Sequence, residues 1–281
     1  SAIHNTKSNP EVKILDLNHE LLKSLDIYIN NQDQKGVITE SIEFKNDFKN
    51  YLNSNYEDIL FDNNKKNVSD LNIEDFMIPI LQNFLKEFKP DLIGISCMFT
   101  MTHKRMIKIA KFSKKFLPNA KIFVGGVHPT SSSELILDEE PSIDFVNLFE
   151  GDISLPSFID YVNSDFKENK SLRQIGMKVE GKYLEIQNRA HPSGETINLP
   201  PDYGDLKVNE YSDLGEIGAY RFWWKKNTVA STILSNRGCR ARCSFCSVRN
   251  FNGKGVRGRS YESVVDELQH LKEFHGVNHV M

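Results

Sequence analysis

Three of the four cysteines in this 281-residue chain lie close together, at Cys239, Cys243 and Cys246, with the spacing C-x3-C-x2-C. A secreted disulfide framework would spread its cysteines along the chain, so this clustering favours metal binding in a reducing compartment. Arg240 and Arg242 lie beside the cysteines and favour the thiolate over the thiol. Three thiolates on one short loop can each bind one iron of a cubane iron–sulfur cluster, where four protein cysteines are usual. One iron is then left without a protein ligand and can bind a reactant.

A structural zinc site is the alternative use of the same thiolates. Such a site needs a fourth cysteine or histidine at a typical spacing. The candidates are His270, His275 and His279, which lie well downstream, on or beyond a predicted helix. The spacing therefore favours an iron–sulfur cluster, and a non-enzymatic zinc-binding module stays the weaker alternative.

The cysteine loop, with Phe245 directly before its last cysteine, resembles the defining loop of the radical S-adenosylmethionine (SAM) superfamily. The resemblance implies a [4Fe–4S] cluster on Cys239, Cys243 and Cys246, with the amino and carboxylate groups of SAM chelating the fourth iron. It implies that Phe245 lies in the SAM-binding site. It also implies that one electron from the cluster cleaves the sulfonium of SAM and produces a 5′-deoxyadenosyl radical.

The same resemblance implies a partial (β/α)6 barrel in which the cluster loop follows the first strand. Residues 230–234 correspond to that strand, 261–275 to the first barrel helix and 276–281 to the start of the second strand. Ser260 is positioned to N-cap the helix, and we interpret the basic, glycine-rich loop at residues 253–259 as a structural connection. The predicted apolar stripe of the helix consists of Val264, Val265, Leu268 and Leu271.

The overall composition excludes several classes of function. Hydrophobic residues make up 39% of the chain and charged residues 26%, as in ordinary soluble globular proteins. The formal net charge of −3 gives no global attraction to nucleic acid or to an anionic membrane. No apolar run approaches the ~20 residues of a membrane span, and residues 1–10 lack the apolar segment of a signal peptide. We therefore expect a cytoplasmic protein that binds neither nucleic acid nor membrane.

Upstream of the cysteines, helical patterns alternate with short apolar segments that are typical of buried strands. We expect helices over residues 73–88, 102–116, 132–137 and 155–163, and strands over residues 11–17, 91–97, 120–124 and 144–148. This alternation predicts an α/β fold with a parallel, doubly wound sheet of the Rossmann or flavodoxin type. Residues 30–72 are expected to form an irregular surface insertion with one helix near residues 41–53.

Three segments of this first half resemble the cobalamin-binding domain that precedes the barrel in one branch of the superfamily. They are residues 89–96, 123–129 and 149–152, and each follows or includes a predicted strand end. Ligands of open α/β sheets bind at the carboxyl ends of the strands. By this resemblance, the expected cobalamin contacts are Ser96, Thr100, Gly125, Gly126, Glu150 and Gly151.

Each of these segments also has an interpretation that needs no cofactor. Gly125 and Gly126 could serve only a tight turn that requires a positive φ. Ser96 could cap the following helix, and Glu150 could be a solvated loop carboxylate. Ordinary loop roles are expected for His103 and His128, and either loop packing or contact with a flat macrocycle for Met98, Phe99 and Met101.

The segment from Asp16 to His19 resembles the D-x-H-x-x-G element that supplies a histidine to cobalt in other cobalamin proteins. The spacing differs, however, and Leu22 stands where the element requires glycine, so we do not expect His19 to be a cobalt ligand. By family order, residues 11–17 correspond to the second strand of the domain. The first strand and helix are therefore expected to be missing, and the chain is expected to be an internal fragment that is inactive alone.

We divide the chain into three parts. Residues 1–163 are expected to form the cobalamin-binding-like domain, and residues 228–281 the N-terminal part of the radical SAM barrel. Between them, residues 164–227 are expected to form a linker, with a hairpin of residues 175–179 and 183–187 around the turn Glu180-Gly181-Lys182.

The resemblance implies a cobalamin-dependent radical SAM enzyme, most commonly one that transfers a methyl group to an unactivated carbon. It implies a small-molecule or metabolite substrate and a reductant such as flavodoxin or ferredoxin. The alternative enzyme is a radical SAM protein without cobalamin, for example one similar to methylthiotransferases. That class needs a second set of three cysteines upstream, where this chain offers only Cys97.

Overall fold

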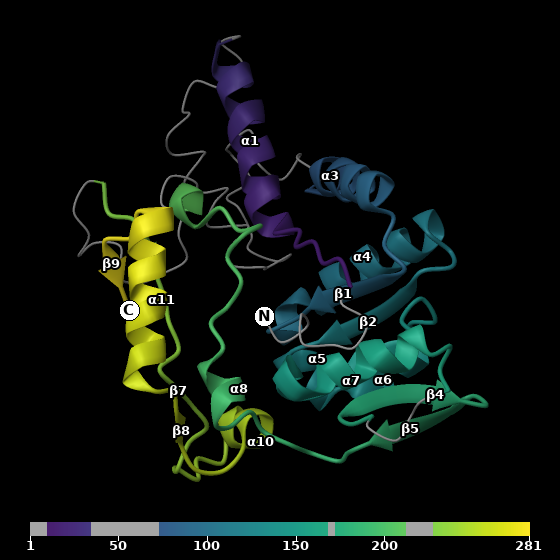
Figure 1. Ribbon diagram of the computed structural model, residues 1–281. Helices are drawn as coiled ribbons and strands as arrows, with labels where there is room; N and C mark the ends of the chain where they lie inside the picture. The colour runs from purple at the N-terminus through teal and green to yellow at the C-terminus, as the bar shows by residue number, and fades with distance from the viewer. Residues whose placement is uncertain (1–9, 35–72, 168–171, 212–226) are drawn as a thin grey trace. The chain divides into compact units, whose positions relative to one another are not determined.

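The computed structural model describes residues 10–34, 73–167, 172–211 and 227–281 (Figure 1). The chain forms two compact units, each of which is described by itself. The first unit comprises residues 1–13, 90–202 and 233–270, and the second comprises residues 14–89, 203–232 and 271–281. The helix predicted near residues 41–53 and most of the predicted insertion at residues 30–72 lie outside the described residues.

The first unit is built on a five-stranded sheet with the order β1-β2-β3-β4-β5. The strands are β1 (Leu92–Ser96), β2 (Lys121–Gly125), β3 (Phe145–Asn147), β4 (Ile175–Val179) and β5 (Lys182–Ile186). β1, β2 and β3 are parallel, as predicted, whereas β4 pairs antiparallel with both β3 and β5. The hairpin that we expect in a linker thus extends the sheet, which is mixed rather than wholly parallel.

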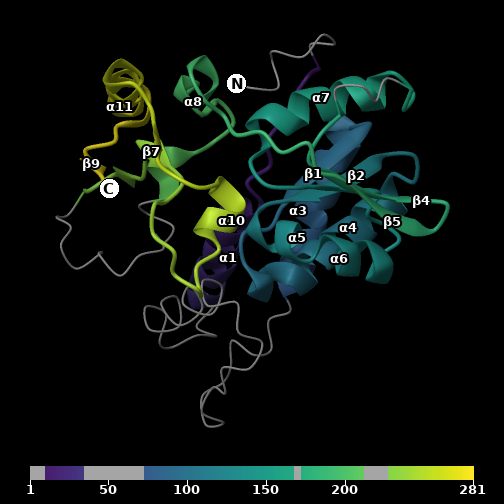
Figure 2. The same ribbon diagram turned by 90° about the horizontal axis from the view of Figure 1, so that it is seen from below.

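Helices cover both faces of this sheet, which confirms the predicted α/β fold class (Figure 2). One face carries α4 (His103–Phe116), α5 (Val127–Ser131) and α6 (Ser133–Glu139), and the other carries α7 (Gly151–Asn163). Three of these helices overlap predicted helices. The short α5 has no counterpart among the predicted elements, because five residues contain too little of the helical period to reveal it.

Alternating side chains of β2 divide the core into two layers. Ile122 and Val124 are fully buried and belong to the layer that includes Met106 of α4. Phe123 points to the opposite face, where its ring centroid lies 5.4 Å from that of the fully buried Phe158 in α7. Successive residues of a strand point to opposite faces, so a single apolar strand supplies both layers.

α7 begins at Gly151, earlier than the predicted start at residue 155. Pro156 indicates the later start, because proline lacks the N–H that an interior helical residue donates. Within the second turn this removes a single backbone hydrogen bond, and the helix extends through it. The end of β3 and the start of α7 are therefore separated only by a short turn, which contains the predicted site residue Glu150.

The strand predicted over residues 11–17 is wrong. These residues form no strand, and Leu17 begins the helix α1 (Leu17–Gln34). The backbone N–H of His19 donates to Oδ1 of Asp16 at 3.1 Å, so Asp16 acts as the N-cap of this helix. The buried apolar residues of α1 recur at helical spacing, at Leu21, Leu22 and Leu25.

α1 packs against α3 (Ile73–Phe88), the helix that the apolar periodicity predicts. The rings of Tyr28 and Phe76 meet edge to face with centroids 5.3 Å apart. Pro79 lies inside α3 without ending it. The buried residues of α3 are Met77, Leu81 and Leu85.

His19 belongs to the packing of the second unit. Its ring is almost fully buried and lies 5.3 Å from the ring of Tyr211, whose hydroxyl donates to Asp16. Its Nε2 lies 3.2 Å from Oε2 of Glu210. These contacts give His19 a structural role, and the expectation that it is not a cobalt ligand stays a prediction.

The C-terminal segment has a strand–helix–strand order, as predicted for the start of a barrel. β6 (Ala230–Ser231) pairs in parallel with β9 (His279–Val280), and α11 (Tyr261–His275) lies between them in sequence. β6 is shorter than the strand predicted over residues 230–234. A parallel pair joined through a helix is the unit from which (β/α) barrels are built.

Ser260 caps α11 as predicted. Its Oγ accepts a hydrogen bond from the backbone N–H of Ser263 at 3.2 Å. Leu271 is fully buried, but the predicted apolar stripe is wrong at Val265, whose side chain is 47% exposed.

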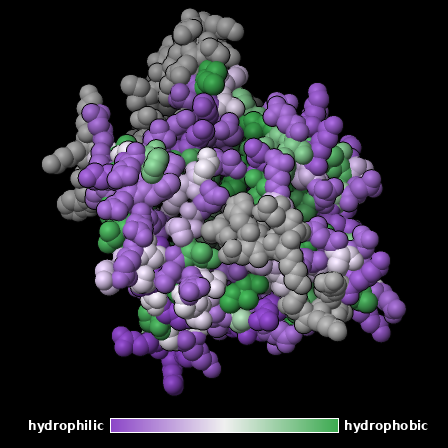
Figure 3. Space-filling view, in the orientation of Figure 1, coloured by the Kyte–Doolittle hydropathy of each residue, from purple (hydrophilic) through white to green (hydrophobic). Residues whose placement is uncertain are grey.

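Hydrophilic residues predominate on the face of the molecule shown in Figure 3. Among the described helices, none has the length and apolar character needed to cross a membrane. The exposed large hydrophobic residues of the first unit include Met98, Phe99 and Met101, which directly follow β1.

Candidate functional site

The predicted residues Ser96 and Gly125 lie side by side at the carboxyl ends of neighbouring strands. In the register of the sheet, Ser96 pairs with Gly125 and Gly125 pairs with Asn147. We call these three residues the strand-end row. Ser96 is exposed, whereas the side chain of Asn147 is buried and donates to Oγ of Ser154 at 2.9 Å. The row lies where open α/β sheets bind their ligands.

Gly126 is the residue of this edge that must be glycine. Its φ is +114°, and a Cβ at this position would lie 2.5 Å from the carbonyl oxygen of Cys97. Gly125 has no such restriction, because its Cβ would meet the carbonyl oxygen of Asn147 at an ordinary 3.5 Å. Of the two glycines, only Gly126 is required by the backbone conformation. The case for Gly125 as a site residue rests on its position in the strand-end row.

Thr130 connects the loops that follow β2 and β3. Its hydroxyl donates to the carbonyl of Gly126 at 2.8 Å and accepts from the backbone N–H of Phe149 at 2.9 Å. Phe149 has a φ of +60°, which is unusual for a residue with a side chain. The two loops that carry predicted cobalamin contacts are thus held together by a single threonine.

Two histidines lie at the same edge, beside the predicted contact Thr100. His128 Nδ1 lies 3.2 Å from Thr100 Oγ1, and His128 Nε2 lies 2.9 Å from His103 Nδ1. Burial lowers the pKa of His128, and the neighbouring His103 lowers it further. His128 is buried in α5, so the expectation of an ordinary loop residue is wrong. Only its position after Gly125-Gly126 could have indicated a role.

The loop after β1 presents a small apolar surface. The side chains of Met98, Phe99 and Met101 are 55%, 62% and 50% exposed. Three neighbouring large hydrophobic residues exposed on one loop are uncommon without a ligand or partner. Their arrangement suits contact with the face of a large, flat ligand.

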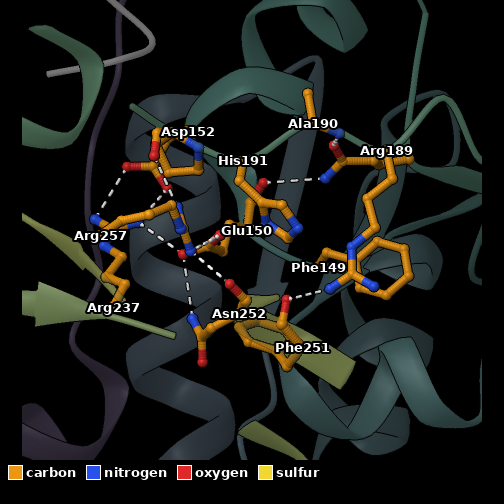
Figure 4. A network of polar contacts seen from close by, with 12 residues as sticks. Phe149, Glu150, Asp152, Arg189, Ala190, His191, Arg237, Phe251, Asn252 and Arg257 are labelled. Atoms are coloured by element: carbon orange, nitrogen blue, oxygen red, sulfur yellow. Dashed lines mark hydrogen bonds and ion pairs between the residues drawn. The ribbon is translucent and has the colours of Figure 1, made fainter. Parts of the chain in front are cut away.

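Glu150, by contrast, is buried and surrounded by donors (Figure 4). Its Oε2 accepts from Arg257 Nη2 at 2.8 Å and lies 3.0 Å from His191 Nδ1. Its Oε1 accepts from Asn252 Nδ2 at 3.2 Å and from Arg237 Nη1 at 3.4 Å. The interpretation as a solvated loop carboxylate is therefore wrong. Both carboxylate oxygens are engaged by side chains of the first unit.

Asp152 adds a second ion pair to this network. Arg237 donates to its carboxylate through Nη1 at 2.7 Å and Nη2 at 3.2 Å, a bidentate arrangement. Burial by itself would lower the pKa of Arg237, but the bonds and charges of Asp152 and Glu150 outweigh burial and raise it. We call the whole network the Glu150 clamp. It consists of Glu150, Asp152, His191, Arg237, Asn252 and Arg257.

Arg189 and Pro192, on either side of His191 in the sequence, add further contacts; Arg189 is shown beside the clamp in Figure 4. Arg189 lies over the Phe149 ring, 4.0 Å from its centroid, and donates to the carbonyl of Phe251 at 3.0 Å. Arg257 Nη1 donates to the carbonyl of Pro192 at 2.7 Å. Gly253 passes so close that a Cβ would lie 2.5 Å from Nε2 of His191.

The three clustered cysteines lie on a loop whose base is held by the clamp. β7 (Asn236–Arg237) and β8 (Arg257–Gly258) pair antiparallel around the loop, with Arg237 opposite Arg257. Inside it, the backbone N–H of Gly255 donates to the carbonyl of Cys239 at 3.3 Å. Arg237 and Arg257 therefore close the loop and bind Glu150 and Asp152 at the same time. The basic loop is more than a connection, because Arg257 belongs to the clamp.

The cysteine loop offers a donor set of three free thiols. Cys239 and Cys246 are partly exposed and Cys243 is exposed, and none of them forms a disulfide. In the described part of the chain, no three His, Cys, Asp or Glu side chains converge on one metal-binding point. The fit to an iron–sulfur cluster therefore rests on the chemistry and spacing of the thiols. Phe245 extends into solvent and is 91% exposed.

Cys97 is chemically different from the other cysteines. It is buried in the core, and its Sγ lies 3.2 Å from Thr102 Oγ1. Burial raises the pKa of the thiol, although the bonds to Thr102 and to the Phe99 carbonyl oppose this. Cys97 is therefore a core residue and not a fourth ligand of the cysteine loop.

The sequence of the chain matches a family of cobalamin-binding domains. The family is described as the B12 binding domain, and the match covers residues 61–159. The cytidylyl-2-hydroxyethylphosphonate methyltransferase of Streptomyces wedmorensis is 27% identical over 214 residues, which are 69% of this chain and 39% of that protein. Residues 61–159 thus match the B12 binding domain, and a relative of the chain is a methyltransferase.

Two solved structures share the fold. The radical SAM methyltransferase TsrM from Kitasatospora setae, solved with cobalamin and a [4Fe–4S] cluster, matches with a TM-score of 0.52 and 15% identity. The match covers 70% of this chain and 38% of TsrM. The cobalamin-dependent SAM radical enzyme OxsB, solved with aqua-cobalamin, matches with a TM-score of 0.57 and 21% identity over 72% of this chain and 26% of OxsB. The chain spans well under half the length of each relative.

Proposed function

We propose that this chain, which contains a B12-binding domain and has the fold of cobalamin-dependent radical SAM proteins, is the cofactor-binding part of such an enzyme. The reaction that we assign to the whole enzyme is methyl transfer to an unactivated carbon of a small molecule. One observation carries the proposal. The loop of three free thiols is closed by two arginines that bind the turn after β3 of the cobalamin-type sheet.

The strand-end edge of the sheet is the proposed cobalamin surface. Ser96, Thr100, Gly125, Gly126 and Gly151 lie at or just after the ends of β1, β2 and β3. Glycines and small side chains allow the backbone to approach a bulky ring closely. The apolar side chains after β1, at Met98, Phe99 and Met101, would exclude water from one side of the ring.

Glu150 is the one expected cobalamin contact to which we assign another role. Its carboxylate accepts hydrogen bonds from the Arg237, Asn252 and Arg257 side chains. A carboxylate with both oxygens engaged and almost no exposure has little left to offer a ligand.

Cys239, Cys243 and Cys246 would hold a [4Fe–4S] cluster, and Phe245 would line the SAM site next to it. When bound, the cluster and SAM supply a 5′-deoxyadenosyl radical, and cobalamin supplies the methyl group. The residues of this chain bind and orient these groups, while the cofactors carry the chemistry. The exposed Cys243 and Phe245 leave the outer side of the loop accessible.

The organisation and setting of the enzyme are part of the same proposal. We assign residues 1–163 to the cobalamin-binding domain, residues 164–227 to a linker whose hairpin β4–β5 extends the sheet, and residues 228–281 to the start of the barrel. We further propose a cytoplasmic enzyme that receives electrons from flavodoxin or ferredoxin. The formal net charge of −3 on this chain gives this part of the enzyme no global attraction to nucleic acid or an anionic membrane.

Anaerobic reconstitution of the full-length protein tests the proposed function. We expect iron and sulfide in the ratio of a [4Fe–4S] cluster, together with the visible absorption bands of cobalamin. Cys243→Ser should lose the iron and keep the cobalamin, whereas Cys97→Ala, the matched cysteine control, should keep both. Iron and sulfide without cobalamin would refute the assignment of the first half. Zinc without iron and sulfide would refute the assignment of the cysteine loop.

A further inference from the structure

We infer that Glu150 is a positioning residue, which holds the cysteine loop at a set distance from the cobalamin surface through the Glu150 clamp. The inference rests on the proposed function, because it assigns the two cofactors to the two sides of this clamp. It adds a role that the cofactor ligands themselves do not supply. The cluster and the cobalamin must present their reacting groups to one substrate, so their separation has to be fixed by the protein.

The clamp joins two segments that are far apart in the sequence. Glu150 and Asp152 belong to the turn between β3 and α7, whereas Arg237, Asn252 and Arg257 flank the cysteines on both sides. Arg237 lies 85 residues from Asp152, and Arg257 lies 107 residues from Glu150. Arg237 and Arg257 pair across β7 and β8 and both bind Glu150, so this one carboxylate holds both ends of the cysteine loop, and Asp152 adds a second partner for Arg237.

The ion pairs of the Glu150 clamp are largely buried, so they favour one arrangement of the cysteine loop and the turn after β3. The Glu150 side chain is 2% exposed, and those of Arg257 and Arg237 are 18% and 22% exposed. Two carboxylates meet two guanidinium groups, so the charges balance when the clamp is closed. Buried ion pairs add little net stability compared with apolar packing, and their best-attested role is to specify one arrangement. Apolar side chains could shift against one another, whereas the planar guanidinium group of arginine binds a carboxylate in one geometry.

The turn that carries Glu150 also faces the proposed cobalamin surface. Gly151 follows Glu150 directly, and Phe149 precedes it with a left-handed φ of +60°. The backbone N–H of Phe149 donates to Thr130, which in turn donates to Gly126 at the strand-end edge. A displacement of this turn would therefore move both the cysteine loop and the loop after β2. One rigid turn thus connects the two cofactor surfaces.

The test compares cofactor loading with coupling in the reconstituted full-length enzyme. Glu150→Gln keeps the size of the side chain but removes the charge that Arg257 and Arg237 neutralise. We expect this variant to load iron and cobalamin at the level of the unaltered enzyme. The ratio of 5′-deoxyadenosine formed to methyl product should rise at least about tenfold, because a misplacement of about 1 Å can cost on the order of 100-fold in rate.

Two further measurements separate positioning from a general structural role. Pulsed electron paramagnetic resonance should show a broader distribution of distances between the reduced cluster and cob(II)alamin in Glu150→Gln. In the chain without cofactors, backbone amides of residues 236–258 should exchange hydrogen faster in the variant, while those of β2 should not change. Glu180→Gln, in the exposed turn between β4 and β5, is the matched carboxylate control and should change neither quantity.

Asn252→Ala provides a milder variant if Glu150→Gln does not fold, because it removes a single hydrogen bond of 3.2 Å to Glu150. It should produce the same effects at smaller size. Unaltered coupling, distances and amide exchange in a folded, fully loaded variant would overturn the inference and leave the proposed function standing. Absence of cobalamin or cluster from the unaltered enzyme would instead overturn the proposed function.

Discussion

The strand-end edge and the Glu150 clamp lie a few residues apart and are built in opposite ways. The edge uses glycines, small hydroxyl residues and the His103–His128 pair, with exposed apolar side chains beside them. The clamp uses buried charges, two carboxylates against two arginines. Backbone and apolar surface suit a large ring that must be approached closely. Directional ion pairs suit a loop that must be held in one place. On our proposal, the turn after β3 lies between a binding surface and a positioning device.

Among these variants, removal of the Glu150 side chain should lower the free energy of unfolding the most. Glu150→Ala leaves Arg257 partly buried without its carboxylate partner, while Arg237 keeps Asp152, and breaking a buried ion pair costs about 3 kcal/mol. We expect the free energy of unfolding of the first unit to fall by about that amount, measured by denaturant-dependent hydrogen exchange in β2 and β3. Glu180→Ala, an exposed carboxylate, should change it by less than about 0.5 kcal/mol. Equal effects of the two variants would contradict a buried clamp.

Gly126→Ala tests the strand-end edge, where the backbone conformation requires glycine. The new Cβ would lie 2.5 Å from the Cys97 carbonyl oxygen at a φ of +114°, so strain and a clash add together. We expect a loss of about 2 kcal/mol in the same exchange measurement. Gly181→Ala has a φ of +78° but no atom within 4 Å of the new Cβ, and it isolates the strain alone, at about 1 kcal/mol. A loss at Gly126 no larger than at Gly181 would show that the close approach to Cys97 is unimportant.

Acid should affect the histidine pair of the strand-end edge. Because burial lowers the pKa of His128 in the folded chain, the unfolded chain binds the proton more readily. The contribution of His128 to stability is therefore present above the usual pKa of about 6.5 and is lost as the pH falls below it. Urea denaturation at about pH 7.5 and about pH 5.5 should show that the free energy of unfolding drops less between these pH values for His128→Asn than for the unaltered chain. An equal drop in the free energy of unfolding would show that groups other than His128 cause the acid sensitivity.

Phe99→Ser should have the smallest effect on the fold. Phe99 is 62% exposed, so its replacement should change the free energy of unfolding by less than about 0.5 kcal/mol. If cobalamin covers this side chain, however, its loss should weaken cobalamin retention by about tenfold, which equilibrium dialysis of the full-length protein would measure. Unchanged retention would remove the apolar loop from the proposed cobalamin surface.

The sequence predicts many of the strands and helices well because their apolar residues recur with clear periods. The apolar run of residues 91–97 and the helical spacing over residues 73–88 each produce the predicted element. The failures have local physical reasons. Residues 11–17 have strand-like composition, but the Asp16 cap begins a helix there instead. Residues 175–187 form the predicted hairpin, but nothing local reveals that it joins the sheet next to β3.

For the site, the spacing of Cys239, Cys243 and Cys246 determined the donor set without any structure, because three thiols on one short loop are close by chain connectivity. The glycine pair after β2 and the position of Ser96 at a strand end were likewise evident from the local pattern. Only the tertiary structure revealed the contacts of Glu150 on which its proposed role rests. Its side-chain partners lie 41 to 107 residues away in the sequence, and contacts over such distances depend on how the chain folds back on itself.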